Sequence, residues 1–285
     1  WLPAQRSFSP LSDRAGFRAQ FTDHYEVSIE RVSKDLVVGF RTFYQRIDAR
    51  VLGGTRVARI DRAARGLHLS SGQNLPYDHL VLATGATART LCVPGAGLSG
   101  VHVLRGLEDA RRIREQLARA RSVAVVGAGF IGLELAAVAR GQGLPMHVIE
   151  ATARPLLRAL SEPMARHLQA FHEAQGTQFH LNTQLDAIEG EDGRATGLRL
   201  LGGGRIVADL IVIAVGVTPN DQLARDAGLA VGYGIEVDEL LLTSDAAISA
   251  LGDCANFPFA ADGGSRVRIE SVQNAVDQAR CIAAR

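Results

Sequence analysis

The sequence predicts an α/β fold made of two related domains, each a three-layer arrangement around a parallel sheet, with the first domain incomplete. Two observations support this prediction. A strand, a glycine-rich loop and a helix follow one another within residues 123–140, and a longer pattern of strands occurs twice along the chain. Strand–loop–helix units of this kind build Rossmann-like dinucleotide-binding domains. The 285 residues are enough for two domains of ordinary size.

The repeated pattern occupies residues 54–85 and again residues 182–216. Each copy has a strand, a hairpin of alternating polar and apolar residues, and an apolar strand that stops at a glycine, Gly85 or Gly216. Apolar strands suit the centre of a parallel sheet, and the hairpins suit a small antiparallel layer beside it. The sequence therefore predicts two related halves.

The glycine-rich loop of the second half has the spacing G-x-G-x-x-G. The four apolar residues 123–126 predict a buried strand, and residues 130–140 predict a helix. Gly127 permits a tight turn, Gly129 lets the backbone approach a pyrophosphate, and Gly132 lets helix and strand pack closely. The helix N-terminus, with Phe130 and Ile131, offers free N–H groups to phosphates. The alternative is a glycine-rich turn in an α/β domain that binds no nucleotide.

A second strand, residues 146–149, ends at Glu150. This acid follows the glycines by about 20 residues, where the motif needs a carboxylate for the ribose 2′-hydroxyl. Glu150 would repel a 2′-phosphate, which favours NAD over NADP. Arg154 and Arg158 follow closely, and Arg158 is a further candidate contact, so the preference is not absolute.

The spacing of the repeat suggests that the chain is a fragment. The second copy lies 128 residues after the first, measured from Thr55 to Thr183. At equal spacing, the glycine loop of the first half would fall just before Trp1. Residues 268–285 predict a helix still in progress where the chain stops, with no glycine, asparagine or proline after it to terminate it.

Five motifs occur in the order of one known family: residues 80–86 with Arg89, and residues 125–134, 216–220, 250–254 and 268–275. They resemble the FAD-dependent pyridine-nucleotide oxidoreductases, two-domain flavoproteins related to glutathione reductase. Within that family the chain is most similar to the NADH-dependent ferredoxin and rubredoxin reductases. The resemblance implies an incomplete, discontinuous FAD-binding domain (residues 1–103 and 223–285), an NAD-binding domain (residues 104–222), and an absent C-terminal interface domain.

The resemblance also implies roles for single residues. Asp253 would accept hydrogen bonds from the ribityl chain of FAD, although an aspartate there could also cap the following segment. The helix that begins near Ser271 and Val272 would point its N-terminus at the flavin. The other residues expected to contact a cofactor are Thr84, Gly85, Ala86, Arg89 and Gly216.

The resemblance makes Glu134 the candidate catalytic residue, beside the nicotinamide, with a solvated helix charge as the alternative. The family usually carries a lysine in a Pro-Leu-Ser-Lys motif that can pair with this glutamate. Here the aligned residue is Asp13, which would place two carboxylates near each other.

Composition and charge exclude several other classes of protein. The net charge of +1 gives no reason to expect a nucleic-acid partner, and the apolar runs are too short to span a bilayer. No signal peptide is visible, and the cysteines, Cys92, Cys254 and Cys281, are far apart without a C-x-x-C motif. We therefore expect no metal site and a cytoplasmic location.

The expected function is that of a flavoprotein oxidoreductase. Hydride would pass from NADH to FAD, and electrons would leave singly to a small iron–sulfur protein such as a ferredoxin or rubredoxin. One alternative is a truncated, FAD-deficient nucleotide-binding remnant without reductase activity. Another is a family member with a different electron acceptor; disulfide reduction is disfavoured because no paired cysteines occur near the flavin motifs.

Overall fold

The computed structural model describes residues 24–33, 36–45, 51–259 and 263–285. It forms two compact units, residues 1–77 and 78–285, which are described separately below. Asp13 lies outside the described residues, so its relation to Glu134 stays a prediction.

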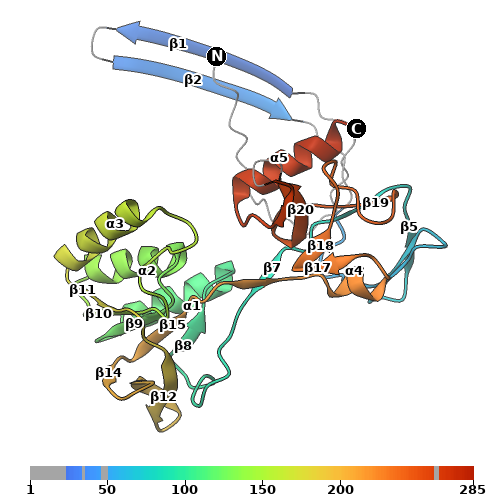
Figure 1. The fold of residues 1–285 in the computed structure, drawn as a ribbon. Helices are drawn as coiled ribbons and strands as arrows, with labels where there is room; N and C mark the ends of the chain where they lie inside the picture. The colour runs from blue at the N-terminus through green and yellow to red at the C-terminus, as the bar shows by residue number, and fades with distance from the viewer. Residues whose placement is uncertain (1–23, 34–35, 46–50, 260–262) are drawn as a thin grey trace. The chain divides into compact units, whose positions relative to one another are not determined.

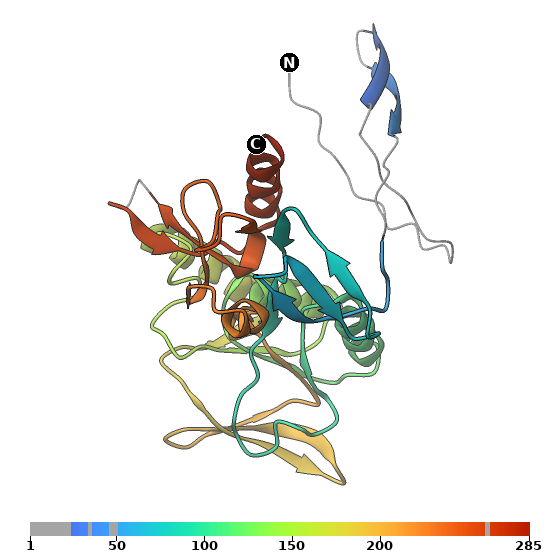
Figure 2. The same cartoon turned by 90° about the vertical axis from the view of Figure 1, so that its right-hand side faces the viewer.

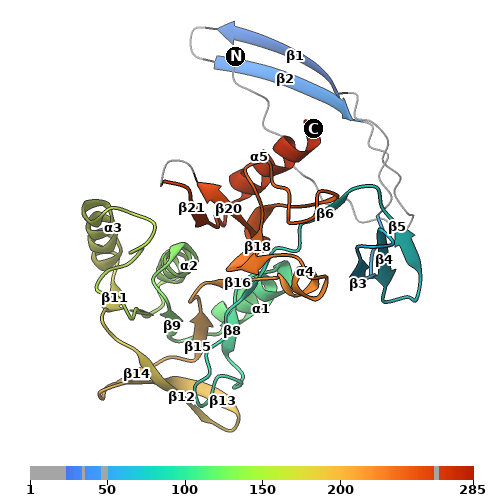
Figure 3. The ribbon, with the colours of Figure 1, turned by 45° about the vertical axis from the view of Figure 1, so that its right-hand side comes forward.

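In the first unit, the strands among the described residues are antiparallel. Strands β1 (His24–Ser33) and β2 (Leu36–Gln45) pair as a hairpin. Strands β3 (Val57–Asp61), β4 (Gly66–Leu69) and β5 (Asn74–Pro76) form a three-stranded sheet (Figure 3). Ile60, Leu67 and Leu69 are buried in it. This sheet is the antiparallel layer predicted for the first copy of the repeat.

The second unit is built around a parallel sheet with the strand order β11-β10-β9-β15-β8 (Figure 1). The strands are β8 (Val101–Val103), β9 (Val123–Val126), β10 (Met146–Ile149), β11 (Thr177–His180) and β15 (Leu210–Ile213). From β9 the chain runs outward through β10 to β11 and then returns to β15 on the other side. Nucleotides bind at the carboxyl ends of the strands where the order reverses in this way.

Two layers cover this sheet, as predicted. Helices α1 (Leu107–Leu117) and α2 (Phe130–Gly141) pack on one face through apolar side chains of alternate strand residues, such as Val123 and Val125. The other face, including Ala124 and Ile211, packs against a second three-stranded antiparallel sheet (Figure 2). That sheet consists of β12 (Leu185–Glu191), β13 (Arg194–Leu200) and β14 (Arg205–Val207). Helix α3 (Glu162–Ala174) contacts β11. The predicted three-layer α/β fold is confirmed.

Two short strands pair although they are far apart in the sequence. Strand β7 (Ala86–Ala88) is antiparallel to β16 (Val217–Pro219), with Ala88 opposite Val217 and Ala86 opposite Pro219. Each strand directly follows the glycine that ends one copy of the repeat, Gly85 or Gly216. We call this pair of strands the β7–β16 ribbon.

Among the remaining elements, strand β6 (Leu80–Leu82) pairs in parallel with β19 (Ile248–Ala250). A four-stranded sheet has the order β17-β18-β20-β21, with β17 (Val231–Gly232), β18 (Gly234–Glu236), β20 (Ala255–Phe259) and β21 (Ser265–Val267). Two short helices are α4 (Gln222–Asp226) and the 3₁₀ turn η1 (Gly252–Cys254). The last helix, α5 (Val272–Ala283), begins where predicted, next to Ser271, which caps it, and so covers only the later part of the helical range 268–285.

Candidate functional site

The glycine loop between β9 and α2 combines two crowded glycines with one open glycine. A Cβ on Gly127 would lie 2.4 Å from the carbonyl oxygen of Ala214, and a Cβ on Gly132 would lie 2.2 Å from the carbonyl oxygen of Gly127. A Cβ on Gly129, in contrast, would meet nothing within 4 Å. The first and third glycines are therefore required for packing, and the second leaves space beside the backbone at the helix N-terminus.

Glu150 is anchored to this loop. Its Oε2 accepts a hydrogen bond from the backbone N–H of Ala128 at 2.8 Å, and its Oε1 accepts from both the N–H and the hydroxyl of Thr152 at 2.8 Å. A carboxylate offers about four acceptor positions, so these bonds leave room for one more donor. Glu150 is thus held at the carboxyl end of β10 next to the open glycine.

The other predicted residues of this half differ in their surroundings. Phe130 is 57% exposed and Ile131 is 38% exposed at the start of α2, and Glu134 is exposed one turn further on. Arg158 is exposed in the loop after β10. Arg154 donates instead to the carbonyl oxygens of Leu157 and Leu160, which holds it within its own loop.

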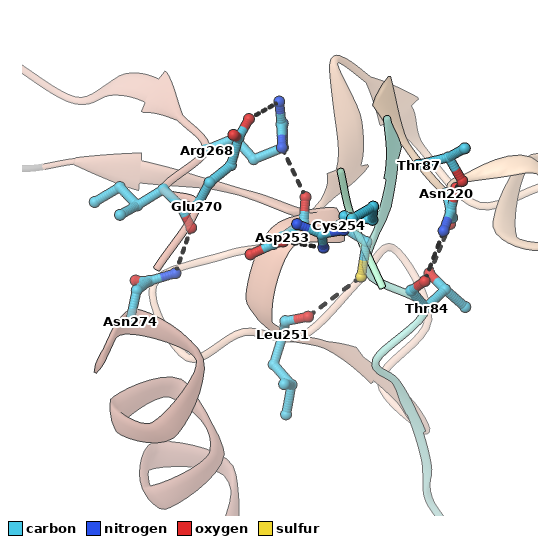
Figure 4. Close-up of polar contacts among 11 residues, drawn as sticks. Thr84, Thr87, Asn220, Leu251, Asp253, Cys254, Arg268, Glu270 and Asn274 are labelled. Carbon is cyan, nitrogen blue, oxygen red and sulfur yellow. Dashed lines mark hydrogen bonds and ion pairs between the residues drawn. The ribbon is translucent and has the colours of Figure 1, made fainter. Parts of the chain in front are cut away.

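The predicted residues of the other half meet at the β7–β16 ribbon, where Asn220 joins the two strands (Figure 4). Its Nδ2 donates to the carbonyl oxygen of Thr84 at 2.8 Å, and its own carbonyl accepts from the Thr84 hydroxyl at 2.6 Å. Its Oδ1 accepts from the Thr87 hydroxyl at 2.7 Å, and its N–H donates to the carbonyl of Gly85 at 2.9 Å. One asparagine therefore connects the ends of the two repeats through hydrogen bonds.

Arg89 and Gly216 belong to the same ribbon. The Arg89 N–H donates to the carbonyl oxygen of Gly216 at 3.0 Å, and its Nε donates to that of Val217 at 3.1 Å. Gly216 has a φ of 94°, a conformation that residues with a Cβ rarely adopt. Ala86 is buried at the start of β7.

Asp253 lies in the η1 turn and is held from several sides (Figure 4). Its carboxylate accepts from Arg105 Nη2 at 2.5 Å, and its carbonyl oxygen accepts from Arg268 Nη1 at 3.0 Å. The preceding Gly252 N–H donates to Oε1 of the buried Gln278 at 2.7 Å. The carboxylate of this polar turn therefore faces the guanidinium of Arg105. Arg105 also lies close to Gly85, because a Cβ on Gly85 would be 3.9 Å from its Nη2 atom.

Arg105, Arg268 and Gln278 were not predicted from the sequence. Arg105 lies two residues after the end of β8, at the carboxyl edge of the parallel sheet, where binding residues concentrate. Its position after a strand was the signal that could have found it. Gln278 and Arg268 carry no such signal, because only the folded chain brings them to η1.

The first turn of α5 is capped by a side chain and begins with an exposed residue. The Ser271 hydroxyl accepts from the Asn274 N–H at 3.1 Å, and Asn274 Nδ2 donates to the carbonyl of Ile269 at 3.0 Å (Figure 4). Val272, the first residue of the helix, is 82% exposed. The first N–H groups of a helix have no partner within it, so this end can accept an anionic group.

No group of at least three histidine, cysteine or acidic residues in the described chain could hold a metal ion. In the same residues, no helix combines the length and the apolar character needed to cross a membrane.

The comparisons with known proteins define the class of protein. The family described as "Pyridine nucleotide-disulphide oxidoreductase" matches residues 20–279, and the chain belongs to this family. The structural neighbours agree with the fold of two Rossmann-like domains.

Among curated relatives, the chain is similar to a rhodocoxin reductase of Rhodococcus erythropolis, with 49% identity over 231 residues, covering 81% of this chain and 54% of that protein. It is 40% identical over 245 residues to a rubredoxin-NAD(+) reductase of Pseudomonas putida, covering 85% of this chain and 63% of the relative. Among solved structures, a ferredoxin reductase for the CYP199A2 system from Rhodopseudomonas palustris superposes with a TM-score of 0.78 at 45% identity, covering 81% of this chain and 57% of that one. The chain thus spans between half and two thirds of the length of these relatives.

Proposed function

We propose that the chain is the nucleotide-binding part of a flavoprotein oxidoreductase that takes electrons from NADH through FAD to a small iron–sulfur protein of the ferredoxin or rubredoxin type. The observation that carries this proposal is the open backbone at Gly129 beside the anchored carboxylate of Glu150. The names of the similar proteins, which include rhodocoxin and rubredoxin reductases, support the electron acceptor.

NADH binding is assigned to the loop of Gly127, Gly129 and Gly132 with the start of α2. The space at Gly129 lets phosphate oxygens approach the helix N–H groups. Glu150 accepts a ribose hydroxyl and disfavours a 2′-phosphate, so NADH is preferred to NADPH. Phe130 and Ile131 are exposed at the start of α2, and Arg158, in the loop after β10, is exposed and is proposed as a further contact.

FAD binding is assigned to the ribbon and the η1 turn, whose donors and acceptors fit the cofactor. Asp253 accepts from ribityl hydroxyls, and Arg105 beside it neutralises a phosphate or the carboxylate itself. The backbone proposed to pass close to the cofactor is that of the ribbon and its flanking residues: Thr84, Gly85, Ala86, Arg89 and Gly216. The N-terminus of α5, at Ser271 and Val272, would stabilise negative charge on a bound flavin.

FAD, when bound, supplies the chemistry that accepts a hydride and releases electrons one at a time. The protein aligns the two cofactors and excludes water. Glu134 is assigned to orient the nicotinamide, since its exposed carboxylate lies on the helix that begins at the phosphate-binding loop.

We further propose the division into an FAD-binding part (residues 1–103 and 223–285) and an NAD-binding part (residues 104–222). Strand β8 is the exception, because it pairs with β15 in the parallel sheet and so belongs with the NAD-binding part. A cytoplasmic location is proposed from the wide spacing of the three cysteines.

The test is anaerobic stopped-flow reduction of the protein after reconstitution with FAD, with NADH and NADPH as alternative donors. We expect bound flavin to give visible absorbance that bleaches faster with NADH than with NADPH. A folded, colourless protein that binds NADH without oxidising it would support the FAD-deficient remnant instead. Equal rates with both donors would refute the role of Glu150.

A further inference from the structure

Tyr233 occupies the tight turn between β17 and β18. The following Gly234 has a φ of 116°, and a Cβ there would lie 2.7 Å from the carbonyl oxygen of Cys254, so the turn is pressed against η1. Tyr233 itself is 50% exposed. An exposed tyrosine in a turn is often only solvated, but this side chain has partners on two separate elements.

The hydroxyl group of Tyr233 joins the two strands of the β7–β16 ribbon. It accepts a hydrogen bond from Arg89 Nη2 at 2.7 Å and donates to the carbonyl oxygen of Val217 at 3.2 Å. Arg89 follows β7 and Val217 begins β16. The phenol therefore fixes the ribbon to the β17–β18 turn.

The ring of Tyr233 lies under the guanidinium of Arg268, with the Cζ atom 4.5 Å from the ring centroid. The Arg268 side chain is only 4% exposed, and its Nε is buried without a hydrogen-bond partner among the described residues. A buried cation is costly unless other groups compensate it. The aromatic face, the Glu270 carboxylate at 2.6 Å and the Asp253 carbonyl at 3.0 Å provide that compensation.

We propose that Tyr233 is a positioning residue that couples the β7–β16 ribbon to the Asp253 turn. Its hydroxyl sets the position of the ribbon, and its ring holds Arg268, which in turn holds the carbonyl of Asp253. The functional meaning of this coupling rests on the proposed flavin site at Asp253. The contacts themselves do not depend on the cofactor.

The two parts of the side chain can be tested separately. Tyr233→Phe removes only the hydroxyl, and Tyr233→Leu removes the ring as well. In cofactor-free protein, backbone hydrogen–deuterium exchange should become at least about threefold to tenfold faster in residues 86–90 and 216–220 of both variants, as expected when the two hydrogen bonds of the hydroxyl are lost. Only Tyr233→Leu should also accelerate exchange in residues 251–256.

Binding of FAD gives the second readout. Titration with quenching of FAD fluorescence should give a weaker affinity than the wild type for Tyr233→Phe, because the ribbon assigned to FAD is loosened. Tyr233→Leu should bind about threefold to tenfold more weakly again, the range of one cation–π contact. Phe171→Leu on α3 is the control, because it removes a ring that is 59% exposed in another part of the unit. This control should match the wild type in every measurement.

The proposal is overturned if Tyr233→Leu leaves exchange at residues 251–256 unchanged, or if Tyr233→Phe disturbs that segment as strongly as Tyr233→Leu. A wild-type protein that does not bind FAD would refute the proposed function. The exchange measurements would still decide whether Tyr233 couples the two segments.

Discussion

Gly129 and Gly132 have opposite surroundings although they are three residues apart in one loop. A Cβ on Gly132 would lie 2.2 Å from a backbone oxygen, whereas a Cβ on Gly129 would meet nothing within 4 Å. The φ of Gly129, −78°, suits any residue. Substitution at Gly132 must therefore disturb the fold, and substitution at Gly129 can only fill the space proposed for the pyrophosphate.

We expect Gly129→Ala to lower the melting temperature only slightly, because alanine is a poorer N-cap than glycine. It should weaken NADH binding by about tenfold or more, as measured by calorimetry, since one lost charged contact is enough for that change. Gly132→Ala should lower the free energy of unfolding by at least about 1–3 kcal/mol because of overpacking. Gly141→Ala, at the end of α2, where a Cβ also meets nothing within 4 Å, should leave NADH affinity unchanged and should not lower the free energy of unfolding. Unchanged NADH affinity in Gly129→Ala would place the nucleotide elsewhere.

The second residue-scale prediction concerns Glu150. Glu150→Gln keeps an oxygen that can accept from Ala128 or Thr152 but removes the charge that repels a 2′-phosphate. We expect the ratio of NADH to NADPH affinity to fall by about tenfold, the effect of roughly 1.4 kcal/mol. The measurement is titration of each dinucleotide, with Glu162→Gln on the exposed side of α3 as the control. An unchanged ratio would contradict the assignment.

At the scale of elements, the β7–β16 ribbon is the connection between the two repeats. Asn220 makes its hydrogen bonds to Thr84, Gly85 and Thr87 across the ribbon. Because each strand leads out of one repeat, we expect the register of the ribbon to set how the loop proposed for NADH and the turn proposed for FAD are aligned.

Asn220→Ala should lower the free energy of unfolding by about 1–3 kcal/mol, because it leaves polar partners unsatisfied. In FAD-reconstituted protein, the rate of flavin reduction at saturating NADH should fall while the dissociation constant of NADH stays unchanged. Stopped-flow measurements over a range of NADH concentrations separate the two quantities. Gln222→Ala, on the exposed side of α4, is the control. A change in NADH affinity alone would argue against an alignment role.

Local patterns were sufficient to predict most elements of the nucleotide-binding sheet. The strands at residues 123–126 and 146–149 are found at those positions, and the predicted helix of residues 130–140 is Phe130–Gly141. These elements have strong periodicity and glycine boundaries in the sequence itself. The repeated antiparallel layer was also predicted, because both copies carry the same alternating pattern.

Contacts between distant segments could not be predicted in this way. The pairing of β7 with β16 and the placement of Arg105 beside Asp253 join residues more than a hundred positions apart. Neither strand of the ribbon has more than three residues, too few for a periodic signal. Tyr233 and Gln278 are likewise assigned by the fold, since single residues in a turn or on a helix carry no pattern.

At the scale of the whole molecule, one buried and two half-buried histidines are expected to make stability respond to acid. His147 and His180 lie on one face of β10 and β11, with His147 Nδ1 3.2 Å from His180 Nε2. Burial, and then the charge of His180, lowers the pKa of His147 below its ordinary value of 6.5, and burial lowers the pKa of His180 and His172. The folded protein therefore resists protonation of these side chains.

Below pH 6.5 the unfolded chain binds more protons at these histidines than the folded protein does. The free energy of unfolding should consequently be nearly constant above about pH 7 and should decrease as the pH falls from there. His147→Gln should reduce the steepness of this decrease by up to about one proton per molecule, because one half-buried titrating group and its repulsion of His180 are removed. Urea denaturation between pH 7.5 and 5.5 measures the slope, and His167→Gln, at an exposed position of α3, should retain the wild-type value. A His147→Gln protein with the wild-type slope would show that the pair does not control the response, and a slope of opposite sign would show that the folded protein stabilises the charged imidazoles.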